Sequence, residues 1–160
     1  MAQEIERKFL VAGDEWRRQS KRPRRIRQGY IVRGPEVVVR VRVFGAHAYL
    51  TIKSTDPGLV RTEFEYEIPV AHAELLLAHA CSGPLIEKTR HKLEWGGLDW
   101  VIDEFDGSLS GLVVAEIELH FVDQEIDIPP WAGREVTDDP EYRNERLSLQ
   151  PEVPRRRATD

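Results

Sequence analysis

The chain of 160 residues is poor in cysteine and has no long apolar run, and each absence excludes a class of protein. A single cysteine, Cys81, excludes an internal disulfide framework and a cysteine-rich zinc site. No apolar stretch approaches the roughly 20 residues that a membrane-spanning helix needs. The first residues, Met1 to Lys8, are rich in charge, so we expect no secretory signal, a cytoplasmic location and no membrane partner.

An excess of positive charge is also missing. The 23 basic and 28 acidic residues leave a net charge of −5, which indicates no nucleic-acid partner. Basic residues do gather at 17–27 and at Arg155 to Arg157, and we interpret these blocks as a solvated loop and tail. Without repeats or linkers, the length fits one domain at residues 1–150, followed by a flexible basic tail at 151–160.

Apolar and charged residues alternate with a period of two along much of the chain, which is typical of β-strands. Strands are predicted at 4–11, 28–32, 37–44, 48–54, 62–69, 85–95, 100–105 and 113–122. Helices are predicted at 71–80 and, in a looser C-terminal region, at 141–149. The fold class is therefore mainly β (α+β by count), and many antiparallel strands with few helices favour a barrel or a sandwich.

The charged faces of these strands carry same-sign pairs two residues apart, such as Glu4 with Glu6 and Arg40 with Arg42. An ordinary sheet would turn such faces to water, yet a solvated face usually mixes signs to limit repulsion. In a barrel with its polar faces inward, the interior would hold cations and carboxylates that need partners. A polyanion with a divalent metal ion would supply partners for both sets.

Seven motifs then become recognisable in order: EIERKFL (4–10), RVR (40–42), TIKS (51–54), EFE (63–65), EKTR (87–90), IDEF (102–105) and EIE (116–118). With VTDDPEYRN (136–144), they make the sequence resemble the CYTH family, the triphosphate tunnel metalloenzymes, along nearly its whole length. The resemblance implies a closed eight-stranded antiparallel β-barrel tunnel with helices packed outside. It also implies metal-dependent chemistry on triphosphates, and the short bacterial single-domain members, which favour inorganic tripolyphosphate, are the most similar.

The resemblance further implies a role for each charged position. Mg²⁺ or Mn²⁺ would be held by Glu4, Glu6, Asp103, Glu116 and Glu118. The phosphate chain would be clamped by Lys8, Arg40, Arg42, Lys53, Lys88 and Arg90. Catalytic roles would fall to Glu63, Glu65 and Tyr30, with Tyr30 expected to border the tunnel mouth. Oxygen ligands of this kind suit hard cations.

The leading hypothesis is metal-dependent hydrolysis of inorganic tripolyphosphate to pyrophosphate and phosphate. The rival enzymes are a class IV adenylate cyclase, which makes cyclic AMP from ATP, and a thiamine or nucleoside triphosphatase. A non-enzymatic module that binds polyphosphate or nucleotides is the rival from another class, although the acidic pairs would hinder a pure anion binder. No segment clearly supplies the base pocket that a cyclase needs. Homodimers are common among relatives, so a second copy of the chain, forming a homodimer, is one expected partner.

Overall fold

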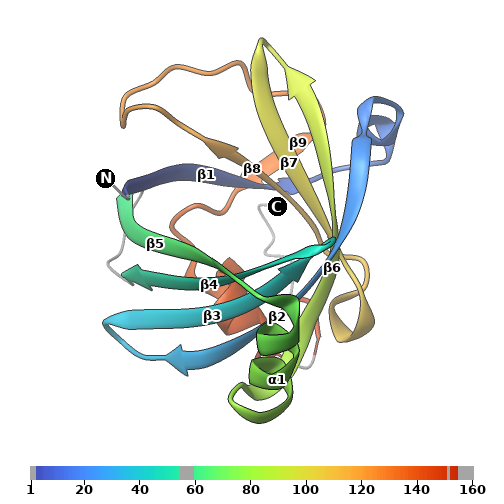
Figure 1. Cartoon of the computed structure of the whole chain (residues 1–160). Helices are drawn as coiled ribbons and strands as arrows, with labels where there is room; N and C mark the ends of the chain where they lie inside the picture. Colours follow the sequence, from blue (N-terminus) through green and yellow to red (C-terminus); the bar gives the residue numbers. More distant parts are fainter. Residues whose placement is uncertain (1–2, 55–59, 151, 155–160) are drawn as a thin grey trace.

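A computed structural model describes residues 3–54, 60–150 and 152–154, and its strands form one antiparallel sheet. The strands are β1 (Gln3–Val11), β2 (Lys21–Arg33), β3 (Val37–Phe44), β4 (His47–Ser54), β5 (Val60–Ile68), β6 (Ser82–Trp95), β7 (Leu98–Phe105), β8 (Val113–Glu118) and β9 (Ala132–Glu135). Their order is β5-β4-β3-β2-β6-β7-β8-β1-β9, and β5 also pairs with β1. Strands β1 to β8 therefore form a closed ring, which confirms the predicted eight-stranded barrel (Figure 1).

Strand β1 closes the ring by dividing its pairings along its length. Residues 6–10 pair with β8, whereas residues 3–5 pair with β5. Further along, Phe9 and Val11 pair with the short strand β9. The barrel is thus closed by only three residues of β1, which pair with β5. The C-terminal strand β9 pairs with the other end of β1.

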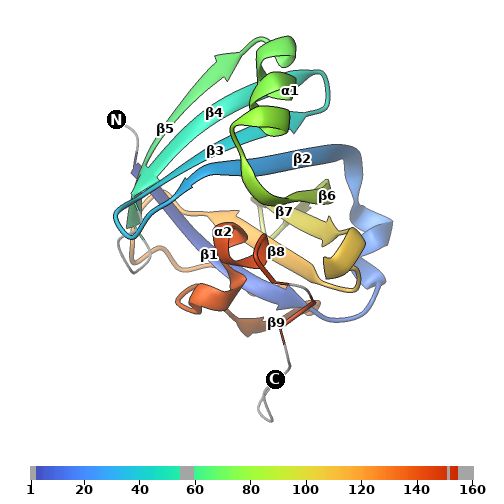
Figure 2. The ribbon, with the colours of Figure 1, turned by 90° about the horizontal axis from the view of Figure 1, so that it is seen from below.

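The longer helix packs on the outside of the barrel, as predicted. Helix α1 (Val70–His79) crosses the outer side of β3 and β4, where Ala73 and Leu77 bury Val41 and Ala48 (Figure 2). The remaining helical segments are short: η1 (Glu15–Gln19), η2 (Gly107–Leu109), η3 (Pro140–Tyr142) and α2 (Asn144–Leu147). Within the described residues, every helix falls short of the length and apolarity that a membrane crossing demands.

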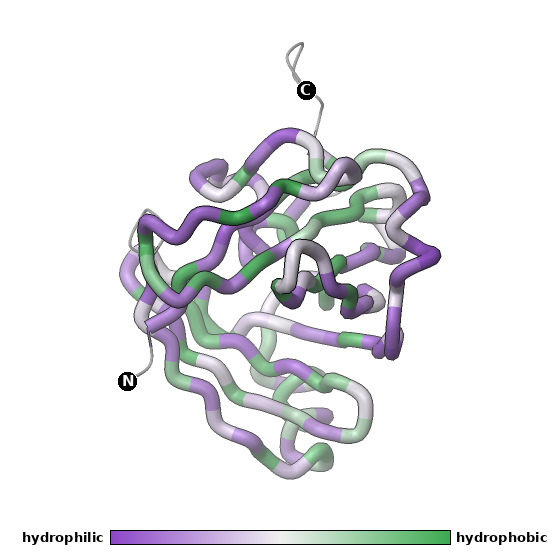
Figure 3. Tube along the Cα trace, turned by 90° about the horizontal axis from the view of Figure 1, so that it is seen from above, coloured by the Kyte–Doolittle hydropathy of each residue, from purple (hydrophilic) through white to green (hydrophobic). Residues whose placement is uncertain are grey.

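Two apolar clusters determine which way the charged faces point. Outside β7 and β8, Trp16, Trp100 and Trp131 pack together, with the rings of Trp100 and Trp131 5.4 Å apart. At one end of the barrel, Tyr30 and other strand residues pack against Tyr142 and Leu147 of the C-terminal segment. Hydropathy accordingly alternates along the strands in Figure 3. The barrel interior is therefore filled by apolar side chains at one end, and its charged part lies beyond them.

The basic run at 17–27 is where the sequence prediction was wrong. Residues 15–19 form η1 and residues 21–33 form β2, whereas we expected a loop followed by a short strand at 28–32. The strand tolerates this charge because Arg25 forms an ion pair with Asp106 and Arg27 forms one with Glu74. Arg155 to Arg157 and most of the predicted tail lie outside the described residues.

Other boundaries also differ near the C-terminus. Strand β8 ends at Glu118 rather than at residue 122, and β9 was not predicted. The predicted helix at 141–149 is divided into η3 and α2, because Arg143 between them has an extended backbone with ψ 138°.

Replacing Trp100 with Ala should lower the free energy of unfolding by about 3–5 kcal/mol, because it opens a cavity in a fully buried aromatic cluster. Urea unfolding of the purified protein measures this change. The matched control is Phe64→Ala, which removes an aromatic side chain that is 47% exposed on the outer face of β5. An equal loss in both variants would contradict the assignment of the cluster as core.

Candidate functional site

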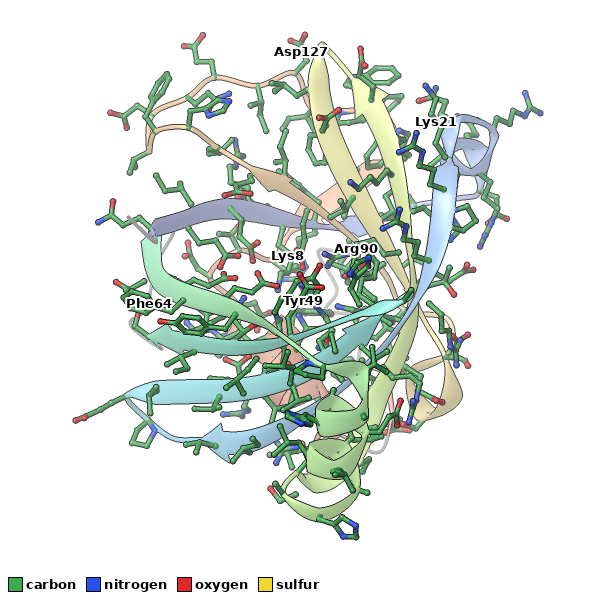
Figure 4. The ribbon with its side chains drawn as sticks, in the orientation of Figure 1. Lys8, Lys21, Tyr49, Phe64, Arg90 and Asp127 are labelled. Atoms are coloured by element: carbon green, nitrogen blue, oxygen red, sulfur yellow. The ribbon has the colours of Figure 1, made fainter. Side chains whose placement is uncertain are left out.

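Side chains from all eight strands of the ring meet in one cavity of about 1070 Å³. Twelve of the predicted site residues line it: Glu4, Glu6, Lys8, Tyr30, Arg40, Arg42, Lys53, Glu63, Glu65, Arg90, Glu116 and Glu118. The other two, Lys88 and Asp103, are buried in the wall with 1% exposure each. Figure 4 shows Lys8 and Arg90 directed into the interior, where side chains of several strands converge. The arrangement follows from the period-two alternation, which turns every second residue of each strand inward.

Asp103 on β7 is the most heavily bonded carboxylate of the site. It accepts two hydrogen bonds of 2.8 Å from Arg90, at Nε and Nη2, and Lys88 Nζ lies 2.8 Å from its Oδ2. Although burial opposes ionisation, Arg90 and Lys88 hold the pKa of Asp103 well below its usual range. Burial lowers the pKa of Lys88 to about 8, against the attraction of Asp103. With both oxygens engaged, Asp103 serves to hold two cations in place.

The remaining carboxylates and cations interlock. Lys53 Nζ lies 3.4 Å from a carboxylate oxygen of both Glu4 and Glu63. Lys8 Nζ lies 3.6 Å from Glu116. Ion pairs thus cross from strand to strand, which offsets the cost of burying so many charges.

The positive charges of two arginines on β3 are less well balanced by nearby carboxylates. Arg40 is 6% exposed, and its one side-chain hydrogen bond within the described residues is a 3.4 Å contact with Thr51. No described carboxylate lies within 4.0 Å of its guanidinium. Arg42 contacts Glu65 at 3.3 Å, yet burial and the charges of Arg40 and Arg90 lower the pKa of Arg42 to about 9. Among the described residues, Arg40 therefore carries a buried positive charge with no carboxylate in direct contact.

The fit of the acidic residues to a divalent metal ion rests on Glu4 and Glu6 of β1. Burial and the charge of Glu4 raise the pKa of Glu6, while Lys53 and a hydrogen bond from Glu6 hold the pKa of Glu4 below its ordinary value despite its burial. Glu6 therefore keeps its proton to higher pH than Glu4, and among the described residues Glu4 Oε2 has no hydrogen-bond partner. Among the described residues, no three acidic, His or Cys side chains already form a metal shell. The donor set, made of carboxylate oxygens, fits a hard cation.

Tyr30 lies at the apolar end of the interior, so its expected place at the tunnel mouth was wrong. Its hydroxyl accepts a hydrogen bond of 3.1 Å from Gln28, and burial raises the pKa of Tyr30 above its ordinary value. The phenol is therefore neutral at neutral pH. It can donate a hydrogen bond to a ligand but cannot act as a base.

Three cavity residues come from places where the sequence analysis assigned no role. Arg61 of β5 forms an ion pair of 3.7 Å with Glu145 of α2. Asn144 accepts a hydrogen bond of 3.2 Å from Lys88 through its Oδ1. Asn144 ends the VTDDPEYRN motif, and that position was the one available signal that the C-terminal segment reaches the site.

Comparisons with known proteins agree on one family. Residues 2–151 match the CYTH domain. The chain is similar to an inorganic triphosphatase of Acetivibrio thermocellus, with 47% identity over 94% of this chain and 96% of the relative. It is also similar to an inorganic triphosphatase of Nitrosomonas europaea, with 40% identity over 91% of this chain and 97% of the relative.

Solved structures support the same relationship. A crystal structure of an inorganic triphosphatase has a TM-score of 0.67 and 36% identity, covering 94% of this chain and 97% of that one. A putative adenylate cyclase from Bacillus halodurans has a TM-score of 0.56 at 20% identity, covering 77% of this chain and 84% of that one. At that level of identity, the second comparison supports the fold alone.

Replacing Asp103 with Asn should lower the free energy of unfolding by about 3–5 kcal/mol at neutral pH, because Lys88 and Arg90 would lose their shared counter-charge. The lowered pKa of Asp103 means that its stabilisation is complete above about pH 4 and is lost as the pH falls further. Urea unfolding across this range should therefore show the gap between wild type and variant shrinking at acid pH. Asp99→Asn, at an exposed position, is the matched control, and a gap of constant size would contradict the assignment.

Proposed function

Because the chain belongs to the CYTH family, we propose that it hydrolyses inorganic tripolyphosphate to pyrophosphate and phosphate, in a reaction that depends on a divalent metal ion. The proposal rests above all on Arg40, a buried guanidinium with no described carboxylate within 4.0 Å, in a cavity that both basic and acidic side chains line. A buried arginine of this kind is costly unless an anion binds beside it. The two relatives named inorganic triphosphatase support tripolyphosphate as that anion.

In this proposal the cations of the cavity clamp the phosphate chain. Arg40 and Arg42 extend from β3 and Arg90 from β6, so the chain would be gripped from two sides. Lys8 and Lys53 add charge from β1 and β4. Phosphoryl transfer passes through a loose, strongly anionic transition state, so catalysis by positioned cations consists largely of charge stabilisation. Lys88, buried in the wall, would act mainly by keeping Asp103 and Arg90 in position.

The metal ligands in the proposal are Glu4, Glu6, Glu116 and Glu118, whose side chains line the cavity. The resemblance implied that Asp103 is also a metal ligand. The proposal leaves it out, because both of its oxygens are bonded to cations of the protein. When bound, Mg²⁺ or Mn²⁺ would neutralise charge on the phosphates. In the proposal, the carboxylates hold the metal ion next to the cations that clamp the phosphate chain.

Glu63, Glu65 and Tyr30 keep narrower proposed roles. Glu63 and Glu65 hold Lys53 and Arg42, and either carboxylate could accept a proton from the attacking water. Tyr30, neutral and directed at the cavity, would donate a hydrogen bond to a phosphate oxygen. The cytoplasmic location, the homodimer and the single domain with a flexible tail stay predictions that come from the sequence.

The cyclase hypothesis receives less support from the lining of the cavity. An adenine base needs an accessible flat apolar surface, and base–aromatic stacking usually provides it. The Tyr, Phe and Trp side chains among the described lining residues are Tyr30 and Trp100, with exposures of 1% and 0%. Binding energy should therefore come from the phosphates, and a nucleoside should add little.

The direct test measures phosphate release from tripolyphosphate and from ATP, together with cyclic AMP formation from ATP, with Mg²⁺, with Mn²⁺ and with excess EDTA. We expect kcat/KM for tripolyphosphate to be at least about tenfold above that for ATP, a gap of about 1.4 kcal/mol in transition-state stabilisation. EDTA should abolish turnover. Cyclic AMP as the main product, or full turnover in EDTA, would sink the proposal.

Replacing Arg40 with Gln should lower kcat/KM for tripolyphosphate by about 100-fold, because a charge-assisted contact of about 3 kcal/mol is lost in a buried site. Steady-state kinetics at fixed ionic strength measures the change. The control is Arg18→Gln, which removes the same charge from an exposed position on η1 outside the cavity. Alanine substitutions at Arg155 to Arg157 should likewise leave turnover unchanged. A comparable loss in either control would mean that net charge, not the clamp, governs activity.

A further inference from the structure

A line of cations leads from the clamp to the rim of the cavity. Lys88, Arg90 and Lys92 stand two apart on β6, so their side chains share one face at intervals of about 6.8 Å. Beside them on β2, Arg24 is the cross-strand partner of Arg90 and Lys21 is that of Lys92. Lys21, Arg22 and Lys92 all line the cavity, and Figure 4 shows Lys21 on the first part of β2, beside β6 and β7. Like charges placed directly opposite each other destabilise a sheet unless something bridges them.

Unlike Arg25 and Arg27, the rim cations have no counter-charge among the described residues. On β2, Arg25 and Arg27 form ion pairs with Asp106 and Glu74. Within the described part of the chain, no carboxylate lies within 4.0 Å of Lys21, Arg22 or Lys92. Glu94 and Asp99 line the cavity further along the hairpin, and they form no ion pair with the rim cations either. Among the described residues, Arg25 and Arg27 are therefore neutralised, whereas Lys21, Arg22 and Lys92 are not.

The backbone at Arg22 provides a second, independent observation. Arg22 has φ 49°, and it is the one described non-glycine residue with positive φ. It lies in an irregularity of the β2–β6 ladder between Lys21 and Arg24. Such bulges redirect side chains, and strained backbone of this kind clusters at functional sites. The distortion brings the side chain of Arg22 to the cavity beside Lys21.

We propose that Lys21, Arg22 and Lys92 form an outer phosphate subsite, which binds the phosphates of linear polyphosphates beyond the three held by the clamp. The inference rests on the proposed function and deepens it. A linear row of cations matches a linear polyanion, and the cavity of about 1070 Å³ exceeds the usual range for drug-sized ligands, which are larger than tripolyphosphate. The Tyr and Trp side chains among the described lining residues, Tyr30 and Trp100, are 1% and 0% exposed, so the lining fits phosphates better than a nucleobase.

The test compares tripolyphosphate and tetrapolyphosphate on the full chain at fixed ionic strength. Lys92→Gln and Arg22→Gln should each raise KM for tetrapolyphosphate about tenfold, while changing that for tripolyphosphate less than about twofold. Arg18→Gln, from the same basic run but outside the cavity, should alter neither value. Arg22→Gly should relieve the strained backbone, so its Tm should be no lower than that of Arg22→Gln, while tetrapolyphosphate binding is lost to the same extent.

Calorimetric titration of both anions in EDTA, where no metal-dependent turnover is expected, separates this inference from the proposed function. The ratio of the two Kd values should favour tetrapolyphosphate in the wild type and fall in Lys92→Gln, whether or not the enzyme turns either anion over. Equal effects on the two anions, or an equal effect of Arg18→Gln, would overturn the subsite. A loss of ATP affinity as large as that of tetrapolyphosphate would also overturn it, because the rim would then hold a nucleoside.

Discussion

Charge buried inside a closed barrel is the constraint on which the rest of the structure depends. A charge removed from water must be paired or it destabilises the fold, and pairing is possible here only because the ring brings side chains of opposite sign together from different strands. Asp103 illustrates this most clearly, since it joins Lys88 and Arg90 of β6 from its place on β7. The two strands thereby fix the orientation of one of the clamp arginines before any ligand binds.

The ion pairing in the interior is incomplete, and the charged groups left without a partner are those that a ligand would contact. Arg40 has no described carboxylate within 4.0 Å, and burial together with the charge of Glu4 raises the pKa of Glu6. The first feature calls for an anion and the second for a cation. A triphosphate together with a divalent ion would complete both, so ligand binding would add counter-charges to a site that is otherwise already built.

Period-two alternation predicted most of the strands and the residues that share each face, because it is a local property. It left a barrel and a sandwich open, and the closed eight-stranded barrel was predicted from the resemblance to the CYTH family. The sequence-based prediction failed for the run at 17–27, since a block of basic residues normally indicates solvent, and only the neighbouring strands reveal that Arg25 and Arg27 have acidic partners. The role of Asp103 was also beyond prediction. It depends on the register between β6 and β7, which the sequence does not specify.

The two ends of the barrel interior differ in chemistry, because one end is apolar and the other is charged and exposed. At one end, Tyr142 and Leu147 of the C-terminal segment fill the space among apolar strand residues, and Tyr142 and Asn144 accept hydrogen bonds from Lys8 and Lys88. Toward the rim, the side chains that continue the line of Arg90 are charged and exposed. A polyanion gains nothing from an apolar floor, so in the proposed function its terminal phosphate would enter first and stop at the clamp. The C-terminal segment thus closes this end of the site, and in the proposed function its position would limit how many phosphates lie beside the carboxylates.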